Sequence, residues 1–212
     1  IAQPHLNVKV VCTHAGLLTS EDGVSAQGIE DLALACSLHG FTVIAPADAA
    51  ETREAVLAAA NTPGPFYIRL SRPATPVVHD DGCPFILGKA EEMAQGRDAT
   101  IVATGTMVAV ALQAAANLGQ QGVTVGVLNM HTLRPADTDA VLKAARDTGA
   151  LATAEEHYIH GGLGSIVGQI LGQGLPVPLE MVALSGYAES GQAPELLRKF
   201  GLDASDVEHA VR

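Results

Sequence analysis

The stretch that decides the fold class is Phe41-Thr-Val-Ile-Ala-Pro-Ala-Asp48, followed by the alanine-rich residues 49–60 and by Phe66-Tyr-Ile-Arg-Leu70. The apolar run from Phe41 to Ala45 predicts a strand that ends at Pro46. Asp48 is a typical N-cap residue, so residues 49–60 are predicted to be helical. Phe66 to Leu70 predicts the next strand. A strand, a helix and a second strand in this order indicate a parallel sheet covered by helices.

The same alternation continues on both sides of this stretch. The sequence predicts further strands at residues 8–12, 100–103, 123–128 and 151–154. It predicts helices from the apolar spacing of Ile29, Leu32, Ala33 and Cys36, from Thr106 as a cap to about residue 120, at 137–145 and 161–171, and around Leu196 and Val207. We therefore expect an α/β protein with two parallel or mixed sheet lobes and helices on both faces.

A break in the periodicity suggests where the two lobes join. Residues 73–84 contain three prolines and an Asp-Asp-Gly, and they have no helical or strand period. The sequence thus predicts a first domain at residues 1–74, a linker at 75–84 and a second domain at 85–212.

Composition limits the class of protein. Apolar residues make up 48% and charged residues 17%, which is typical of a well-buried globular chain. A net charge of -11 disfavours nucleic acid and anionic membranes as partners, and no apolar stretch is long enough to span a bilayer. The N-terminal residues do not resemble a signal peptide. Cys12, Cys36 and Cys83 are expected to be reduced thiols, and the protein is expected to be cytoplasmic.

A polar loop at residues 13–28 follows a predicted buried strand, and Ser71-Arg72 follows another. Ligands of parallel sheets bind at the carboxyl ends of strands, so His14, Asp22 and Arg72 are expected in one crevice. There Arg72 can hold a phosphate as a bidentate fork, His14 can donate, and Asp22 can accept from hydroxyls of a phosphorylated polyol. The alternative stays open at this point: a turn aspartate, a loop histidine and a surface ion pair.

Residues 13–31, THAGLLTSEDGVSAQGIED, also resemble a known signature. They are similar to the His-x-Gly-Leu-x-x-Gly-Glu-Asp-Gly-x-Ser-His-Gln-x-x-Glu-Asp segment of transketolase-type, thiamine-diphosphate-dependent enzymes. Ser20 replaces the usual Gly and Ala26 the usual His. The resemblance extends over residues 41–53 and 64–72, similar to the end of the pyrimidine-binding domain, and over 99–106, 127–135, 154–165 and 188–191, similar to the C-terminal domain. The chain looks like the C-terminal subunit of a split transketolase.

This resemblance implies an activity and roles for individual residues. Transketolases transfer a two-carbon ketol unit from a ketose phosphate to an aldose phosphate with thiamine diphosphate and magnesium. By resemblance, His14 helps to hold the sugar phosphate, Asp22 recognises a substrate hydroxyl and Arg72 binds the phosphate. The family's histidine at the position of Ala26 approaches substrate oxygens, and alanine offers no donor or acceptor there.

The resemblance places the remaining machinery outside this sequence. The glutamate that activates the cofactor is expected upstream of Ile1, and the magnesium and diphosphate are expected largely on another half or subunit. The implied partners are an N-terminal transketolase subunit, in a homodimer or heterotetramer, and sugar phosphates. Three alternatives remain: a deoxyxylulose-phosphate-synthase-like enzyme, a 2-oxoacid dehydrogenase beta-subunit-like enzyme, and a non-catalytic assembly subunit.

Four further motifs are interpreted structurally. The glycines at 161–164 suggest tight strand–helix packing rather than a phosphate cradle. Residues 155–160, Glu-Glu-His-Tyr-Ile-His, do not have zinc-protease spacing and suggest a structural or interface role. Ser190 lacks the Gly-x-Ser-x-Gly elbow of serine hydrolases. Asp137 and Asp139 are interpreted as charges at a helix start.

Overall fold

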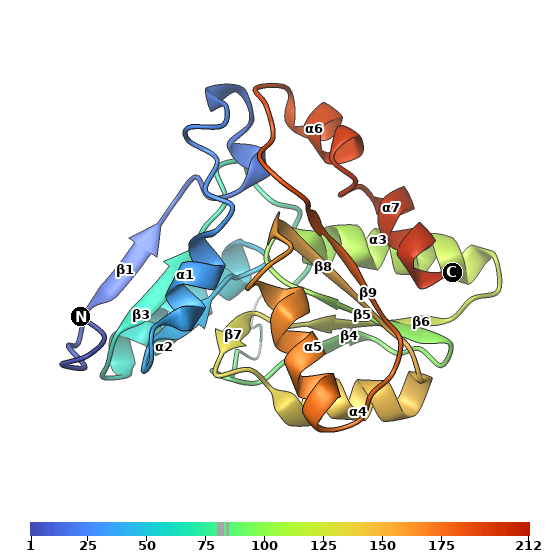
Figure 1. Cartoon of the computed structure of the whole chain (residues 1–212), viewed down its shortest axis with the longest axis horizontal. Helices are drawn as coiled ribbons and strands as arrows, with labels where there is room; N and C mark the ends of the chain where they lie inside the picture. The colour runs from blue at the N-terminus through green and yellow to red at the C-terminus, as the bar shows by residue number, and fades with distance from the viewer. Residues whose placement is uncertain (80–82, 84) are drawn as a thin grey trace.

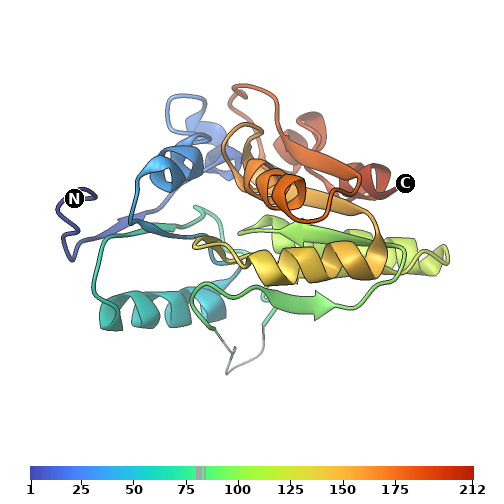
Figure 2. The same cartoon turned by 60° about the horizontal axis from the view of Figure 1, so that its bottom comes forward.

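The computed structural model describes residues 1–79, 83 and 85–212, and they form two sheets that lie side by side (Figure 1). The first sheet has the order β1-β3-β2-β7. Its strands are β1 (Lys9–Cys12), β3 (Phe66–Arg69), β2 (Thr42–Ile44) and β7 (Thr132–Arg134), of which only β7 runs antiparallel to its neighbour. Helices α1 (Asp31–Ser37) and α2 (Ala49–Asn61) lie above and below this sheet in Figure 2.

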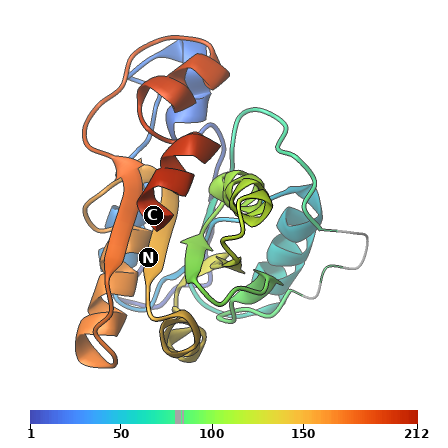
Figure 3. The ribbon, with the colours of Figure 1, turned by 90° about the vertical axis from the view of Figure 1, so that its right-hand side faces the viewer.

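The second sheet has the order β4-β6-β5-β8-β9. Its strands are β4 (Glu91–Ala94), β6 (Val125–Asn129), β5 (Ala99–Ala103), β8 (Leu151–Tyr158) and β9 (Leu179–Leu184), with β4 antiparallel at one edge. Helices α3 (Met107–Gln120) and α7 (Ala204–Val211) pack on one face, and α4 (Thr138–Thr148) and α5 (Leu163–Gln173) pack on the other. Helix α6 (Ala193–Lys199) packs against a 3-10 helix, η1 (Leu17–Asp22), as Figure 3 shows from the C-terminal side.

The central strands explain why both faces need helices. Residues of β5 and β6 are buried throughout. Ile101 and Val127 point into the core beneath α3, while Val102 and Leu128 point into the core beneath α4 and α5. This alternation with a period of two is the geometry of a strand, and apolar side chains on both faces are expected of a central parallel strand.

One of the two predicted helix caps is confirmed, and Asp137, which was interpreted as a charge at a helix start, is also a cap. Asp48 accepts the Glu51 N–H at 2.9 Å at the start of α2, and Asp137 accepts the Ala140 N–H at 3.2 Å at the start of α4. The prediction for Thr106 is wrong. Its φ of -56° is already helical and its side chain makes no cap hydrogen bond, because the hydroxyl donates to the buried Glu156 at 2.7 Å instead.

Several strands differ from the expectation. The sequence analysis did not predict β4, β7 or β9, and the antiparallel β4 and β7 make both sheets mixed. The strand before His14 is an edge strand and not a buried one, since Val11 in β1 is 47% exposed. The first sheet also takes its last strand, β7, from the segment 85–212.

The segment expected to link the lobes has no helix or strand among its described residues. The predicted Asp80-Asp81-Gly82 turn and Pro84 lie outside the described residues. Cys12, Cys36 and Cys83 are free thiols, of which Cys36 and Cys83 are buried and Cys12 is half-buried. In the part of the chain that the structure describes, no helix has the length and apolar character needed to cross a membrane.

Candidate functional site

The loop after β1 has an unusual backbone. His14 and Ser20 both have φ of 62°, in the left-handed region that non-glycine residues rarely adopt. Ser20 interrupts η1 with ψ of -112°, yet it is buried and its hydroxyl donates to the Leu18 carbonyl at 2.9 Å. A residue in such a conformation costs about 1–3 kcal/mol and persists only where its surroundings fix it.

The carboxylate of Glu156, on β8, is the main anchor of this loop. One oxygen accepts the Leu18 N–H at 2.6 Å and the other accepts the Thr106 hydroxyl at 2.7 Å. Gly16 passes so close that a Cβ there would lie 2.3 Å from Glu156 Oε1, so this position requires glycine. Burial raises the pKa of Glu156, and the Arg69 guanidinium opposes this rise.

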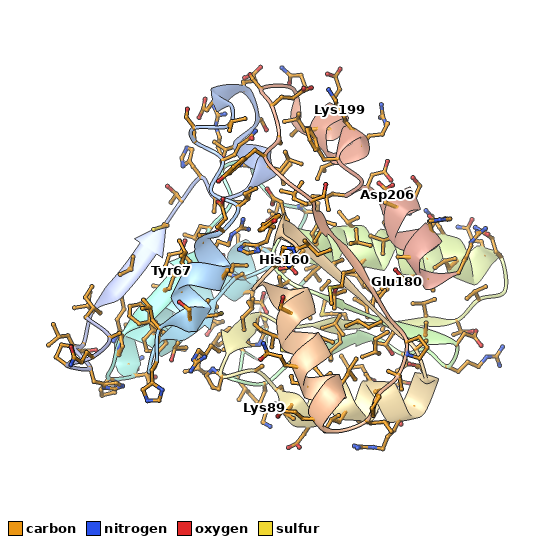
Figure 4. All side chains as sticks on the ribbon, viewed as in Figure 1. Tyr67, Lys89, His160, Glu180, Lys199 and Asp206 are labelled. Atoms are coloured by element: carbon orange, nitrogen blue, oxygen red, sulfur yellow. The ribbon has the colours of Figure 1, made fainter. Side chains whose placement is uncertain are left out.

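Arg69, at the end of β3, joins the loop base to both sheets. Its Nε donates to the two Asp31 carboxylate oxygens at 3.2 and 3.0 Å, and its Nη2 donates to the Glu156 carbonyl at 2.8 Å. Tyr67, labelled in Figure 4, donates to Asp31 at 2.7 Å. Burial works against the charge on Arg69, but Asp31 and Glu156 outweigh it and raise the Arg69 pKa. The result is a buried ion pair that fixes where α1 begins.

The C-terminal segment holds the loop from the other side. The Ser190 hydroxyl donates to the Glu21 carbonyl at 2.7 Å, and the Gln27 side chain donates to the Glu189 carbonyl at 3.0 Å. Gln192 donates to the Glu21 carboxylate. Residues 188–192 therefore act as a clamp on residues 21–27, and Ser190 has a structural contact there.

The three predicted site residues lie in this fixed loop and at the end of β3. Arg72 Nη1 lies 3.4 Å from Asp22 Oδ1 and donates to the Thr19 carbonyl at 2.7 Å. The described contact of the His14 ring is with the Thr13 hydroxyl, at 2.9 Å. The Thr19 hydroxyl donates to the His14 carbonyl, so Thr19 is the link between His14 and Arg72. The structure thus pairs Asp22 with Arg72 and leaves the exposed His14 ring apart from both.

A cavity of about 410 Å³ lies at the carboxyl ends of β2 and β3. Ser71 lines it, and the buried Ser71 hydroxyl has no hydrogen-bond partner among the described atoms. Its wall also includes Asp48, Thr52 and Arg53. His14, Asp22 and Arg72 are not among its lining residues. The Asp22–Arg72 pair is therefore not part of the wall of this cavity.

The Glu155–His160 stretch and the nearby glycines have the packing role that the sequence suggested. Glu155 accepts the Leu163 and Gly164 N–H groups at 2.7 and 2.8 Å, so it occupies the N-terminus of α5 itself. A Cβ at Gly162 would lie 2.0 Å from Glu155 Oε2. His157 Nε2 accepts the Ala33 N–H at 3.3 Å, which ties β8 to α1. Burial lowers the His157 pKa and favours the neutral ring that this hydrogen bond requires.

The chain is similar to known proteins in both sequence and fold. Residues 1–77 match the family described as "Transketolase, pyrimidine binding domain", and residues 88–207 match "Transketolase, C-terminal domain". The chain belongs to the transketolase family. The resemblance of its separated motifs is thereby confirmed. This chain covers 66% of some transketolase relatives and 34% of others.

The relatives include separate subunits. The "6-deoxy-6-sulfo-D-fructose transketolase subunit SqwH" of Clostridium sp. (strain MSTE9) is 40% identical over 100% of this chain and 66% of its own length. The "Putative transketolase C-terminal section" of Methanocaldococcus jannaschii is 36% identical over 98% of this chain and 66% of its own. A solved structure, "Split gene transketolase, inactive beta4 tetramer", is 43% identical with a TM-score of 0.91, covering 100% of this chain and 67% of that one. The chain thus spans about two thirds of the curated subunits that it matches.

A second group of chemically reactive side chains was not predicted from the sequence. Glu51, His79, Cys83 and Glu91 place one ligand atom each within 4.8 Å of one another. They come from α2, the segment after residue 74, and β4. The sequence shows His79 and Cys83 four residues apart, which is a signal of possible metal binding, but only the fold brings Glu51 and Glu91 to them.

Proposed function

We propose that this chain is the C-terminal section of a two-part transketolase, a transferase that moves a two-carbon ketol unit between sugar phosphates. The observation that carries the proposal is the Asp22–Arg72 pair, with Arg72 Nη1 3.4 Å from Asp22 Oδ1, fixed at the carboxyl end of β3 in a transketolase fold. The Clostridium and Methanocaldococcus relatives support a divided enzyme by their names.

In this proposal Arg72 binds the phosphate and Asp22 binds a substrate hydroxyl. The Thr19 carbonyl holds Nη1 of Arg72 and leaves its other guanidinium nitrogens for a bidentate phosphate. The pair is half-exposed, with 35% of the Arg72 side chain and 45% of the Asp22 side chain accessible. An exposed pair of this kind contributes at most about 1 kcal/mol, so a phosphate dianion can replace Asp22 at low cost.

His14 is proposed as a further donor to the sugar phosphate. Its left-handed backbone is fixed by the Thr19 hydroxyl, and its ring is exposed. Ala26 is exposed on the same loop and offers no polar atom. The contact with substrate oxygens that the family's histidine makes at that position is therefore absent from this chain.

Thiamine diphosphate and magnesium are proposed to be held largely by an N-terminal subunit. When bound, thiamine diphosphate supplies the carbanion that carries the ketol unit. We assign no residue of this sequence to the cofactor's pyrimidine or diphosphate. We therefore derive no step through the cofactor.

We further propose a homodimer or heterotetramer that works in the cytoplasm, where the unpaired thiols stay reduced.

The test uses the chain together with its diphosphate-binding subunit. We expect Arg72→Ala to raise KM for a phosphorylated aldose by about 10-fold or more, the effect of losing one charge-assisted contact. An aldehyde acceptor without a phosphate should show little change. Arg97→Ala is the control, because Arg97 is 77% exposed and lies 3.7 Å from its neighbour Asp98 in the other lobe. Equal losses for both acceptors would refute phosphate binding by Arg72.

A further inference from the structure

The cluster of Glu51, His79, Cys83 and Glu91 shares no residue with the Asp22–Arg72 pair, and its residues come from α2, the segment after residue 74 and β4. Three of the four residues are buried and Glu91 is partly exposed. The ligand atoms come from different elements of the fold, since Glu51 belongs to a helix and Glu91 to an edge strand. Imidazole, thiolate and carboxylate are the side chains that bind Zn²⁺ in proteins.

His79 has the placement of a metal-binding imidazole. Its Nε2 lies 3.1 Å from Glu91 Oε2 and 4.0 Å from Glu51 Oε1. Its other nitrogen, Nδ1, lies 3.1 Å from Asp48 Oδ2 and has no hydrogen bond of good geometry, although the residue is only 6% exposed. A carboxylate behind one ring nitrogen orients the other nitrogen toward a metal.

Asp48 fixes the position of His79 through the backbone. Its Oδ2 accepts the Val78 and His79 N–H groups at 2.8 and 2.9 Å, while its Oδ1 caps α2 through the Glu51 N–H. The same aspartate therefore holds the helix that carries Glu51 next to the segment that carries His79. Glu51 itself is held by the Ala47 N–H at 2.6 Å and the Asn129 amide at 2.8 Å.

The charges of the cluster are unbalanced. Burial raises the pKa of the Cys83 thiol to about 12, and the carboxylates of Glu51, Glu91 and Asp48 add to the rise. Burial also raises the pKa of Glu51 to about 7. Lys89 is turned toward the start of α4, 3.5 Å from Asp137 (Figure 4). The carboxylates of Asp48, Glu51 and Glu91 thus all lie within 4.0 Å of a nitrogen of the His79 ring.

We propose that Glu51, His79, Cys83 and Glu91 form a structural site for a divalent transition-metal cation of the Zn²⁺ type, which fastens the segment after residue 74 to α2 and β4. Ligand atoms around tetrahedral zinc lie roughly 3.3–3.8 Å apart, given bonds of about 2.0–2.3 Å. The present spacing, within 4.8 Å, requires side-chain shifts of about an ångström. Four protein ligands leave no open position, which is the pattern of a structural site and not of a catalytic one.

The ligand set also selects the cation. Thiolate and imidazole favour zinc, cobalt and their neighbours over Mg²⁺, which prefers oxygen ligands and keeps several waters. The partly exposed Glu91, with 27% of its side chain accessible, gives the ion an entry path. The proposed ligand set therefore does not suit Mg²⁺.

The test measures Zn²⁺ binding by the intact protein, from which a chelator has first removed any bound metal. After Zn²⁺ is added and the excess is dialysed away, we expect one equivalent to be retained and the thermal midpoint of unfolding to rise by several degrees. Co²⁺ in its place should show a thiolate-to-metal charge-transfer band, and excess Mg²⁺ should leave that band unchanged. Cys83→Ser should abolish the band, and His79→Gln should weaken Zn²⁺ affinity by about 100-fold or more.

Cys12→Ser is the matched control, because Cys12 is a free thiol on β1 outside the cluster. It should keep both the band and the stoichiometry of the unsubstituted protein. Sub-stoichiometric Zn²⁺ in the unsubstituted protein would overturn the proposal. So would a charge-transfer band that survives Cys83→Ser or disappears in Cys12→Ser.

Discussion

Removing the Arg69 guanidinium is the perturbation whose effect follows most directly from the structure. Arg69 is 7% exposed and donates to both Asp31 oxygens and to the Glu156 carbonyl. Arg69→Met keeps a long side chain of comparable reach but leaves Asp31 without its cation and Glu156 without its opposing charge. Breaking a buried pair from one side costs about 3–5 kcal/mol, because a charge remains buried without compensation.

The expected loss is large relative to the stability of a domain. A cost of about 4 kcal/mol compares with a total of about 5–15 kcal/mol for typical proteins. With a urea dependence of roughly 2 kcal/mol per molar, the unfolding midpoint should fall by about 2 M. The assay is equilibrium urea unfolding followed by far-UV circular dichroism. Arg97→Met, at the exposed Arg97, should change the free energy of unfolding by less than about 0.5 kcal/mol.

A double-substitution cycle separates the ion pair from general packing. Asp31→Asn removes the partner charge, and the double variant Arg69→Met/Asp31→Asn buries neither charge at this pair. If the ion pair is responsible, the double variant should be more stable than the sum of the single losses implies, by about 0.5–3 kcal/mol. A midpoint shift below about 0.5 M for Arg69→Met, or strict additivity, would refute the reasoning.

Three further predictions concern stability. Burial raises the Glu155 pKa from 4.5 to about 7, so the folded state retains a proton and its stability should fall, by up to about 3 kcal/mol, as pH rises through this range. Urea titrations should show this slope lost in Glu155→Gln, and an unchanged slope would contradict it. Gly164→Ala brings a Cβ 2.8 Å from Met181 Sδ, whereas Gly172→Ala meets nothing within 4 Å. Thermal unfolding should show the first losing about 1–3 kcal/mol and the second gaining about 0.5–1 kcal/mol, and equal signs would be inconsistent with this packing. Ser20→Gly should relieve its backbone and raise the thermal midpoint by about 2–4 °C, and a lower midpoint would argue against strain there.

Local signals in the sequence were sufficient for the elements that depend on their own residues. The Asp48 cap and the alanine-rich turns after it define α2, and the apolar run around Phe66 defines β3. Such elements are predictable because a few adjacent side chains determine the cap or the buried face. The Thr106 cap failed because Glu156, far away in the chain, takes its hydroxyl.

The elements that were missed depend on distant partners. β4 reads Glu-Glu-Met-Ala, and it becomes a strand because β6 provides the hydrogen-bonding edge. β7 has three residues, too few for any period, and it forms against β2.

The candidate site divides in the same way. Position at strand ends predicted that His14, Asp22 and Arg72 share one crevice. In the structure Arg72 lies 3.4 Å from Asp22, while the described contact of the His14 ring is with Thr13. Their roles in binding remain predictions. The anchoring by Glu156 and the approach of Glu51 and Glu91 to His79 were not visible in the sequence, because each joins residues from separate parts of the chain.

The strand β7 has a consequence for how the chain can be cut. It belongs to the C-terminal part of the sequence, yet it pairs with β2, and its last residue, Arg134, donates to the Cys36 carbonyl at 2.8 Å. Proteolysis between residues 75 and 79 would sever the connection in sequence but not this exchanged strand, so the two fragments should co-elute and dissociate only in denaturant. A gene divided at that point would encode two parts of one folding unit, because the N-terminal part needs β7 of the C-terminal part to complete the first sheet.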